Sequence, residues 1–256
     1  MFERLEFRAR PAEVEPRLVS LELTIVLPAY NEELCIAQVV GQWCAVAGKA
    51  GNGRVIVVDD GSSDRTRQIL NTLLAVHPEL TVIHQQNAGH GAAIQLGYRI
   101  ALDMDSEWIF QTDSDGQTSP ADFEAFWRHR AETAFQTGVR NSRHDPAIRI
   151  LLSRWHERIV EFIFGVVVQD PNVPFRLMRG DLVKGYLELI PAGTFAPNVL
   201  MSVLASRQGV LTSRPVAHSA RSAGQTSVKG WRMVRMGLRS LREYLAFRRV
   251  VRRAIL

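Results

Sequence analysis

The fold of this chain is indicated most clearly by a stretch near its middle, WIFQTDSDGQ, at residues 108–117. Its first half is an apolar run with the length and composition of a buried β-strand. Its second half places the carboxylates of Asp113 and Asp115 directly after that run. Two carboxylates at a strand end can hold a hard divalent cation, Mg²⁺ or Mn²⁺, which in turn can bridge two phosphates. We therefore predict a metal-dependent phosphate site at this point of the chain.

Comparable apolar runs lie on both sides of this stretch and alternate with segments of helical periodicity. Strands that are apolar on both faces are typical of a parallel sheet covered by helices, so the pattern predicts a Rossmann-like α/β sandwich with a mostly parallel central sheet. In such sheets, ligands collect at the carboxyl ends of the strands. The predicted strands occupy residues 23–28, 54–59, 80–84, 108–112 and 134–139, and the predicted helices occupy 33–47, 63–76, 91–104 and 120–132.

Beyond residue 140 the alternation gives way to a helical stretch at 148–164, a turn-rich segment at 169–175 and a helix from Asp181. A chain of this length can bury one sizeable core, so we predict one catalytic domain with additions at both ends. The predicted divisions are an N-terminal extension (1–22), the catalytic domain (23–228) with a nucleotide-binding half (about 23–140) and an acceptor half (about 141–228), and a basic amphipathic tail helix (229–256).

The net charge of +5 is distributed unevenly. Residues 229–256 hold nine of the 31 Lys and Arg residues together with one acidic residue, Glu243. The rest of the chain holds 22 basic and 25 acidic residues. Because the body of the protein has no excess of positive charge, we expect no nucleic-acid partner.

The sequence favours a cytoplasmic protein without a transmembrane segment. Residues 1–17 mix charges without a continuous apolar run, unlike a secretory signal. The most apolar later stretch, 159–168, is about ten residues long, whereas a spanning helix needs about 20. Cys35 and Cys44 would lie roughly 13 Å apart along one helix, too far for a disulfide, and buried free thiols are typical of a reducing compartment.

The aspartate pair alone is compatible with other structures. An Asx-rich turn and a calcium loop can both begin with D-x-D, but Thr118 stands where a calcium loop needs glycine. A phosphohydrolase could use Asp113 as its nucleophile. Such enzymes carry their acidic metal-binding pair after the nucleophile, whereas here Asp59 and Asp60 come before it. The phosphohydrolase remains an alternative, as does a binding module that holds a nucleotide sugar without turning it over.

Six segments carry a further pattern: VLPAYNEE (26–33), VVDDGSSDRT (57–66), NAGHGAAIQLG (87–97), TDSDGQ (112–117), DPNVPFR (170–176) and HSARSAGQTS (218–227). Taken in order, they resemble the family-2 glycosyltransferases, which have the GT-A fold. The resemblance is closest to the group of dolichol-phosphate mannosyltransferase and the polyprenyl-phosphate sugar synthases, and it runs from about Leu23 to Lys229. It implies an inverting enzyme that transfers a sugar from a UDP- or GDP-linked donor.

The resemblance also implies roles for individual residues. Asp113 and Asp115 would hold the metal, and Gln117 would orient a phosphate or the acceptor. Arg221 would lie on a loop that closes over the donor, whereas Asp170 would be either a general base or a structural hydrogen-bond acceptor. The residues expected to bind the nucleotide sugar are Pro28, Ala29, Tyr30, Glu32, Asp60, Asn87, Gly89, Arg140, Arg154 and Arg176.

The nature of the acceptor is suggested by a missing carboxylate. Many relatives carry a catalytic acid after the central segment, whereas TFAPNVL at 194–200 contains Asn198 and no acid. A lipid phosphate is already ionised and needs no general base. The leading acceptor is therefore a polyprenyl phosphate, and a soluble or glycan hydroxyl is the alternative.

The tail provides a second indication of the acceptor. An apolar stripe lies beside a row of arginines, which is typical of a helix on the cytoplasmic face of a membrane and equally of a helix packed on its own domain. The stripe consists of Trp231, Val234, Leu238, Leu241 and Leu245, and the arginines are Arg232, Arg235, Arg239, Arg242, Arg249 and Arg253.

Overall fold

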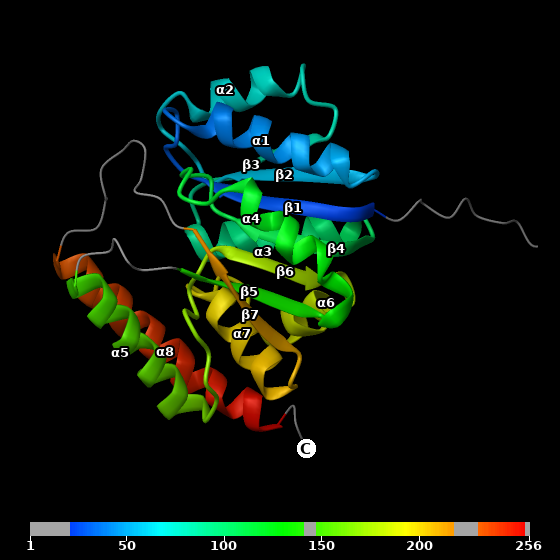
Figure 1. Cartoon of the computed structure of the whole chain (residues 1–256). Coiled ribbons are helices and arrows are strands. Elements are labelled where there is room, and N and C mark those ends of the chain that lie inside the picture. Colours follow the sequence, from blue (N-terminus) through cyan, green and yellow to red (C-terminus); the bar gives the residue numbers. More distant parts are fainter. Residues whose placement is uncertain (1–20, 141–146, 218–229, 254–256) are drawn as a thin grey trace, which may run out of the picture.

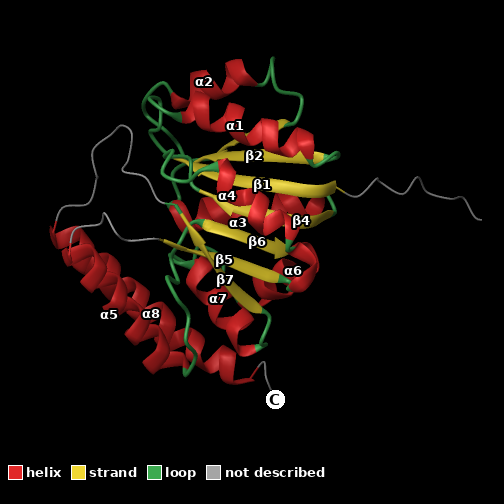
Figure 2. Cartoon of the chain, viewed as in Figure 1, coloured by secondary structure: helices red, strands yellow, loops and turns green. Residues whose placement is uncertain are grey.

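The computed structural model describes residues 21–140, 147–217 and 230–253 (Figure 1). A seven-stranded sheet, in the order β3-β2-β1-β4-β6-β5-β7, lies between helices on its two faces (Figure 2). The predicted α/β sandwich is confirmed. The strands are β1 (Leu21–Ala29), β2 (Gly53–Asp59), β3 (Leu80–His84), β4 (Ser106–Thr112), β5 (Phe135–Arg140), β6 (Phe175–Arg179) and β7 (Leu211–Val216).

The first four strands are parallel to one another and end at one edge of the sheet. Most side chains of β1, β2 and β4 are buried on both faces, which explains their uninterrupted apolar runs, whereas those of the edge strand β3 are mostly half-buried. Along β1, Leu23 and Ile25 pack into one hydrophobic cluster, whereas Val26 packs into the other. The two clusters hold β1 in the middle of the sheet, so the polar residues that follow it emerge at the common carboxyl edge.

One face of the sheet is covered by α1 (Ile36–Lys49), α2 (Thr66–Leu73) and α4 (Pro120–Arg128). Trp43 of α1 and Phe123 of α4 contact Phe110 of β4, with ring centroids 5.1 and 4.8 Å away. Helices α1 and α2 each begin three residues later than the sequence pattern predicts. Cys35 and Cys44 are both buried free thiols, as predicted.

The second half of the sheet differs from the prediction. Strand β6 runs antiparallel between β4 and β5, and β7 is parallel to β5. The sequence pattern does not predict β6, β7 or α7 (Pro197–Arg207), because β6 is short and carries two arginines, β7 contains a proline, and α7 is buried on all sides and so lacks an amphipathic pattern. The remaining elements are α3 (His90–Asp103), the short helix η1 (Arg130–Glu132) and α6 (Gly180–Leu189).

The tail helix α8 (Gly230–Arg253) lies beside α5 (Ala147–Phe164), and the two run together along one side of the molecule (Figure 1). Tyr244, Phe247 and Val251 form the buried face of α8. The ring of Phe164 on α5 lies 5.9 Å from that of Tyr244. The tail is therefore packed on the protein's own domain, through a face that the sequence analysis did not single out.

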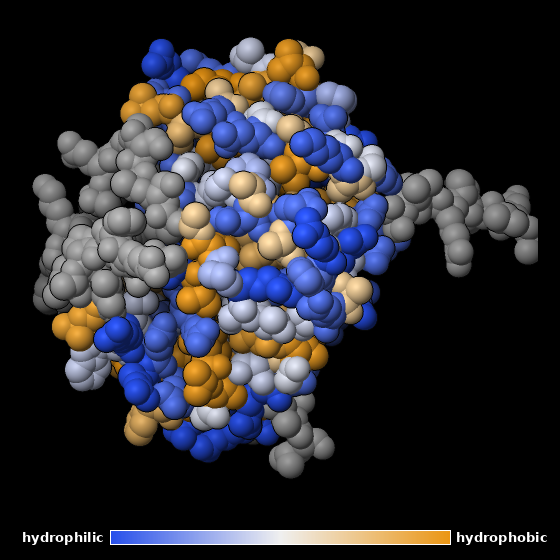
Figure 3. Space-filling model, viewed as in Figure 1, coloured by the Kyte–Doolittle hydropathy of each residue, from blue (hydrophilic) through white to orange (hydrophobic). Residues whose placement is uncertain are grey.

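The apolar stripe predicted for the tail lies on a different side of α8. Leu238, Leu241 and Leu245 are exposed, and the side chains of Trp231 and Val234 lie outside the described residues. Apolar and hydrophilic residues are interspersed where these two helices reach the surface (Figure 3). Within the described ranges, no helix combines the length and the apolar content that crossing a bilayer would require.

Candidate active site

A cavity of about 380 Å³ opens at the carboxyl edge of the sheet, where β1, β2 and β4 end. Most of the residues predicted to bind the donor or the metal lie around it, because parallel neighbouring strands deliver their following loops to the same place. His90, Ala93 and Ser114 complete its wall without having been predicted to take part. The predicted residues that line the cavity are Pro28, Ala29, Tyr30, Glu32, Asp60, Asn87, Gly89, Asp113 and Asp115.

The loop of the two aspartates is tied to the end of β1. The hydroxyl of Ser114, between them, donates a hydrogen bond of 2.8 Å to the carbonyl of Pro28. The backbone N–H of Gln117 donates to Oδ1 of Asp115 at 3.0 Å. Gln117 does not itself line the cavity, so the structure assigns its main chain to shaping this loop.

Asp113 has a perturbed titration. Burial raises its pKa, the nearby imidazole of His90 opposes this effect, and the charge of Asp115 adds to it. Nε2 of His90 lies 3.7 Å from Oδ1 of Asp113, and the Asp113 side chain is 25% exposed. Two neighbouring carboxylates in a partly desolvated cavity repel each other, and a cation between them would relieve that repulsion.

A buried chain of hydrogen bonds supports Asp113 from behind. The amide of Gln111 donates to Oδ1 of Asp113 at 3.3 Å, and the amide of Asn198 donates to Oε1 of Gln111 at 2.8 Å. Tyr98 donates from its hydroxyl to Oδ1 of Asn198 at 2.9 Å. The sequence analysis missed this chain, although a glutamine inside an apolar strand is a signal that it needs a buried partner.

Asp60 shapes the turn that precedes α3. Its carboxylate accepts hydrogen bonds from the amide of Gln85 at 2.6 Å and from the backbone N–H groups of Ala88 and Gly89 at 2.8 and 2.9 Å. Gly89 adopts a φ of +95°, which favours glycine. Asp60 thus lines the cavity while its oxygens hold the turn that exposes the amino end of α3.

The start of α3 is also held from the acceptor half. A Cβ on Gly91 would lie 2.2 Å from the carbonyl oxygen of Thr194, so only glycine allows this close approach. The next residue, Phe195, donates its backbone N–H to both oxygens of Glu243 on α8, at 2.9 and 3.1 Å. The guanidinium of Arg239, on the same helix, lies 5.3 Å from the centre of the Phe195 ring.

Tyr30 lines the cavity, whereas Arg140 and Asp170 do not. Tyr30 is 47% exposed at the rim of the cavity, which excludes packing in the core. Arg140 and Asp170 lie outside the cavity lining and form a two-pronged ion pair, with Nε–Oδ2 and Nη2–Oδ1 distances of 2.7 Å. Both oxygens of Asp170 are therefore engaged by Arg140.

The remaining predicted arginines do not line the cavity. Arg176 requires a correction, because it is fully buried and donates to the carbonyls of Pro171, Val173 and Asn198 and to the hydroxyl of Ser202. It therefore joins the segment before β6 to α7 and is not available to the donor. Arg154 is exposed on α5, away from the cavity lining. Arg221 lies outside the described residues.

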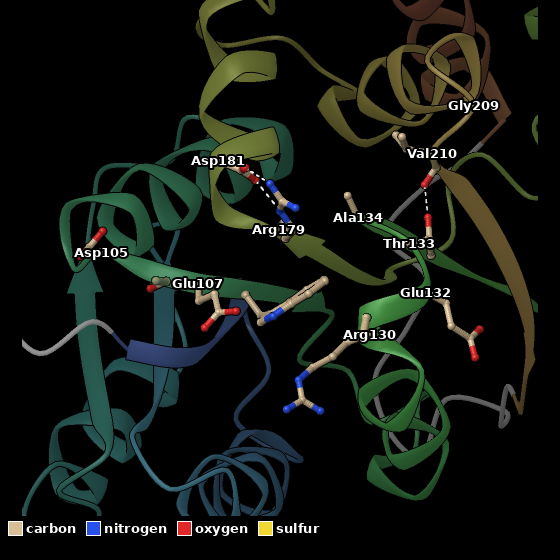
Figure 4. A pocket seen from close by; sticks show the side chains of 13 residues that line it. Asp105, Glu107, Arg130, Glu132, Thr133, Ala134, Arg179, Asp181, Gly209 and Val210 are labelled. Carbon is tan, nitrogen blue, oxygen red and sulfur yellow. Dashed lines mark hydrogen bonds and ion pairs between the residues drawn. The ribbon is translucent and has the colours of Figure 1, made fainter.

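A larger cavity, of about 1010 Å³, lies at the opposite end of the strands (Figure 4). It opens at the amino ends of β4 and β5, beside Asp105 and Thr133. Its arginines already have partners: Arg179 pairs with Asp181, and Arg130 lies 3.2 Å from Glu22. The smaller cavity, with its two aspartates at the carboxyl edge, is therefore the candidate active site.

The fold and the position of this site define a class of protein. Glucosyl-3-phosphoglycerate synthase of Mycobacterium tuberculosis superposes with a TM-score of 0.63 at 17% identity, covering 89% of this chain and 80% of that chain. For mannosyl-3-phosphoglycerate synthase of Rubrobacter xylanophilus the TM-score is 0.63 at 14% identity, covering 92% and 76%. The architecture is the GT-A fold of the glycosyltransferases. The family described as glycosyl transferase family 2 matches residues 24–179, and the chain belongs to this family.

Two curated relatives that share one name are similar to this chain over most of its length. The chain is 28% identical over 209 residues, 80% of its length, to the undecaprenyl-phosphate 4-deoxy-4-formamido-L-arabinose transferase of Shewanella sediminis. It is 27% identical over 219 residues, 84% of its length, to the enzyme of the same name in Pseudomonas fluorescens. The chain spans 61% and 62% of the length of these two relatives. The predicted resemblance to polyprenyl-phosphate sugar transferases is confirmed.

Proposed function

We propose that this protein is an inverting glycosyltransferase that moves a sugar from a UDP- or GDP-linked donor to a polyprenyl phosphate. The observation that carries the proposal is the cavity at the carboxyl edge, where Asp113 and Asp115 share one space with the turn of Asn87 and Gly89. Support comes from the relatives, which are named undecaprenyl-phosphate sugar transferases. The synthase of M. tuberculosis, which shares the fold, was solved with Mn²⁺, UDP-glucose and phosphoglyceric acid.

The residues around the cavity suit the parts of such a donor. The exposed ring of Tyr30 offers a surface on which a base can stack, and Glu32 offers a carboxylate to ribose hydroxyls. The amino end of α3, which follows the glycine turn at Gly89, offers a positive dipole end to a diphosphate. Asp60 acts in this proposal by holding that turn in shape.

Asp113 and Asp115 would hold Mg²⁺ or Mn²⁺, because paired carboxylates are the ligands that hard divalent cations prefer. Such an ion supplies Lewis-acid stabilisation of the leaving diphosphate. The raised pKa of Asp113 fits this role, since a carboxylate that is costly to charge in the free protein gains from a neighbouring cation. Gln111 keeps the carboxylate of Asp113 oriented toward the cavity wall that it shares with Asp115.

The lack of a carboxylate free to act as general base, at Asp170 or near Asn198, favours a phosphate acceptor. Asp170 is bound on both oxygens by Arg140, and Asn198, in the segment where relatives carry an acid, is buried in the hydrogen-bond chain behind Asp113. A lipid phosphate attacks as an anion and needs no proton removed.

The pair of α5 and α8 would supply contact with the cytoplasmic face of the membrane. On α5, Trp155 and Phe162 are 62% and 86% exposed, and on α8 the stripe of Leu238, Leu241 and Leu245 is exposed. An apolar groove of about 460 Å³ runs between the two helices. Arginines beside such a face gain about 1 kcal/mol each near an anionic leaflet. Among the α8 side chains that the structure describes, the exposed arginines are Arg235, Arg239, Arg242, Arg249 and Arg252.

A transfer assay tests the proposal. The purified chain is incubated with Mg²⁺ or Mn²⁺, a panel of UDP- and GDP-sugars and undecaprenyl phosphate in detergent, and sugar on the lipid is measured. We expect metal-dependent lipid product that is lost in Asp115→Ala and kept in Asp103→Asn, which removes an exposed carboxylate outside the cavity. Transfer to a sugar hydroxyl without lipid product would show that the acceptor is a hydroxyl and not a polyprenyl phosphate. Phosphate release through a trapped aspartyl-phosphate would overturn the proposal in favour of a phosphohydrolase.

A further inference from the structure

Three side chains that neither the family pattern nor the cavity uses lie close together between α1 and the connection from α2 to β3. Cys44 belongs to α1, and His77 and Glu79 lie in the connection between α2 and β3. One ligand atom from each, the thiol sulfur, an imidazole nitrogen and a carboxylate oxygen, lies within 4.8 Å of the other two. None of the three lines the candidate active site.

The local fold fixes the backbone on which His77 and Glu79 stand. The N–H of His77 bonds to the carbonyl of Leu73 at 3.0 Å, which continues the last turn of α2. The carbonyl of Glu79 accepts the N–H of Val55 at 2.9 Å, which ties Glu79 to the start of β2. Arg54 donates to the carbonyl of Pro78, between the two residues. The connection is thus held in place on both sides of the cluster.

Cys44 is fixed just as firmly from the other side. It lies on the inner face of α1, is 3% exposed, and packs in the hydrophobic cluster beneath the helix. Gly48, one turn further along α1, leaves space beside Glu79, since a Cβ there would lie 3.6 Å from Oε1 of Glu79. The thiol sulfur lies within 4.8 Å of a nitrogen of His77 and a carboxylate oxygen of Glu79.

We propose that Cys44, His77 and Glu79 form a binding site for Zn²⁺ or a similar borderline-soft cation, with a water molecule as the fourth ligand. Sulfur, nitrogen and oxygen from Cys, His and Glu are the ligand types that Zn²⁺ combines, whereas Mg²⁺ and Mn²⁺ prefer oxygen alone. The ligands of a tetrahedral Zn²⁺ lie about 3 to 4 Å apart, so small side-chain rotations bring the three atoms into range.

A cation bound at this cluster has to displace the proton of the Cys44 thiol, because the thiolate is the metal ligand. Burial and the charge of Glu79 raise the pKa of the Cys44 thiol to about 11, so the metal-free protein keeps the thiol protonated. Binding of the cation displaces this proton and places positive charge between the thiolate and the Glu79 carboxylate. The bound ion would fasten α1 to the connection that leads into β3, within the nucleotide-binding half.

The site is tested with Co²⁺, which replaces Zn²⁺ and gives a thiolate-to-cobalt charge-transfer band in the near ultraviolet. The full-length chain is stripped with chelator and titrated with Co²⁺. We expect one equivalent to produce the band and Zn²⁺ to abolish it by competition. Cobalt held by the aspartates of the cavity has no sulfur ligand and gives no such band.

Two sets of variants assign the signal. Cys35→Ser is the matched control, because Cys35 is the other buried thiol and lies near the loop of Ser114 instead. It should keep the band, whereas Cys44→Ser should lose it. His77→Gln and Glu79→Gln alter half-buried side chains and should each weaken Co²⁺ binding by roughly tenfold or more. A missing band in the wild-type chain, or a band that survives Cys44→Ser, would overturn the proposal.

Discussion

The guanidinium of Arg140 and the carboxylate of Asp170 meet in a fork, with two nitrogen–oxygen distances of 2.7 Å. The pair joins the end of β5 to the turn that precedes β6. The backbone N–H of Arg140 adds a third hydrogen bond to Asp170, at 3.2 Å. Glu157 of α5 accepts the backbone N–H of Asp170, so three separate segments depend on this residue.

The first prediction concerns the charge of Asp170. Asp170→Asn should lower the free energy of unfolding by about 3 kcal/mol, because it removes the negative charge that balances Arg140 while both side chains are largely buried. Asparagine tolerates the φ of +41° found at this position, so backbone strain does not enter. Denaturant unfolding measures the change. Glu124→Gln, which breaks an exposed pair with Arg128, should leave the midpoint unchanged, and equal effects of the two substitutions would contradict the reasoning.

A second prediction follows from the close approach at Gly91. Gly91→Ala should destabilise the protein by about 2 kcal/mol, because the added methyl meets two carbonyl oxygens of backbone that cannot rotate away. Gly185→Ala, at an exposed position of α6 with open space around it, should be neutral or stabilising. The Tm of both variants measures the effect. An unchanged Tm in Gly91→Ala would show that the 194–195 segment adjusts freely and would contradict the prediction.

The third prediction addresses the hydrogen-bond chain behind Asp113. Asn198→Leu keeps the number and branching of the side-chain heavy atoms but leaves the buried amide of Gln111 and the hydroxyl of Tyr98 without their partner. The free energy of unfolding should fall by about 2 kcal/mol, and the binding of Mn²⁺ measured by calorimetry should weaken several-fold. Asn71→Ala, which removes an exposed partner of His84, is the control and should leave Mn²⁺ binding intact. Unchanged Mn²⁺ binding in Asn198→Leu would show that this chain of hydrogen bonds does not support the metal site.

The fourth prediction concerns pH. Burial lowers the pKa of His156 from its ordinary value near 6.5, although the charge of Asp170 opposes the effect, and its ring bonds to the hydroxyl of Tyr244 at 2.9 Å. A lowered pKa stabilises the folded state above about pH 6.5, and this stability is lost as the pH falls through the lowered value. The Tm of the wild-type chain should therefore fall on acidification below about pH 6.5 more steeply than that of His156→Gln. His129→Gln, at the surface beside Glu132, should behave as wild type, and parallel curves for all three proteins would refute the assignment.

A fifth prediction tests the face formed by α5 and α8. Trp155→Glu and Leu241→Glu each place a charge beside the apolar groove and should weaken binding to vesicles that contain anionic lipid by about tenfold. Leu74→Glu changes an exposed leucine beyond α2 and is the matched control. Co-sedimentation with vesicles measures the effect. If Leu74→Glu weakens binding as much as the other two, the contact has been assigned to the wrong face.

The sequence predicts the first half of the fold well because β1, β2 and β4 are buried on both faces and leave uninterrupted apolar runs. Since parallel strands end at a common edge, the positions of Asp60 and Asp113 directly after two of these runs also predict that they meet there. Burial of a charged side chain leaves no comparable signal. Arg176 stands in a family motif, yet its hydrogen bonds to Pro171 and Asn198 exist only in the folded chain.

Long-range polar contacts are hidden from the sequence for a similar reason. Gln111 and Asn198 are far apart along the chain, and neither shows by itself that it supports Asp113. The role of α7, which carries Asn198, is equally obscured, since a helix buried on all sides lacks the periodicity that reveals surface helices.

The hydrogen bonds between Phe195 and Glu243 affect the choice of chain length for experiments on this protein. Glu243 is the only acidic residue of the basic tail, and it holds the segment whose carbonyls press against the start of α3. A shortened chain that stops before Gly230, chosen to improve solubility, would remove this brace along with the apolar face. Loss of activity in such a chain would then report a loosened wall of the cavity as readily as a lost attachment to lipid.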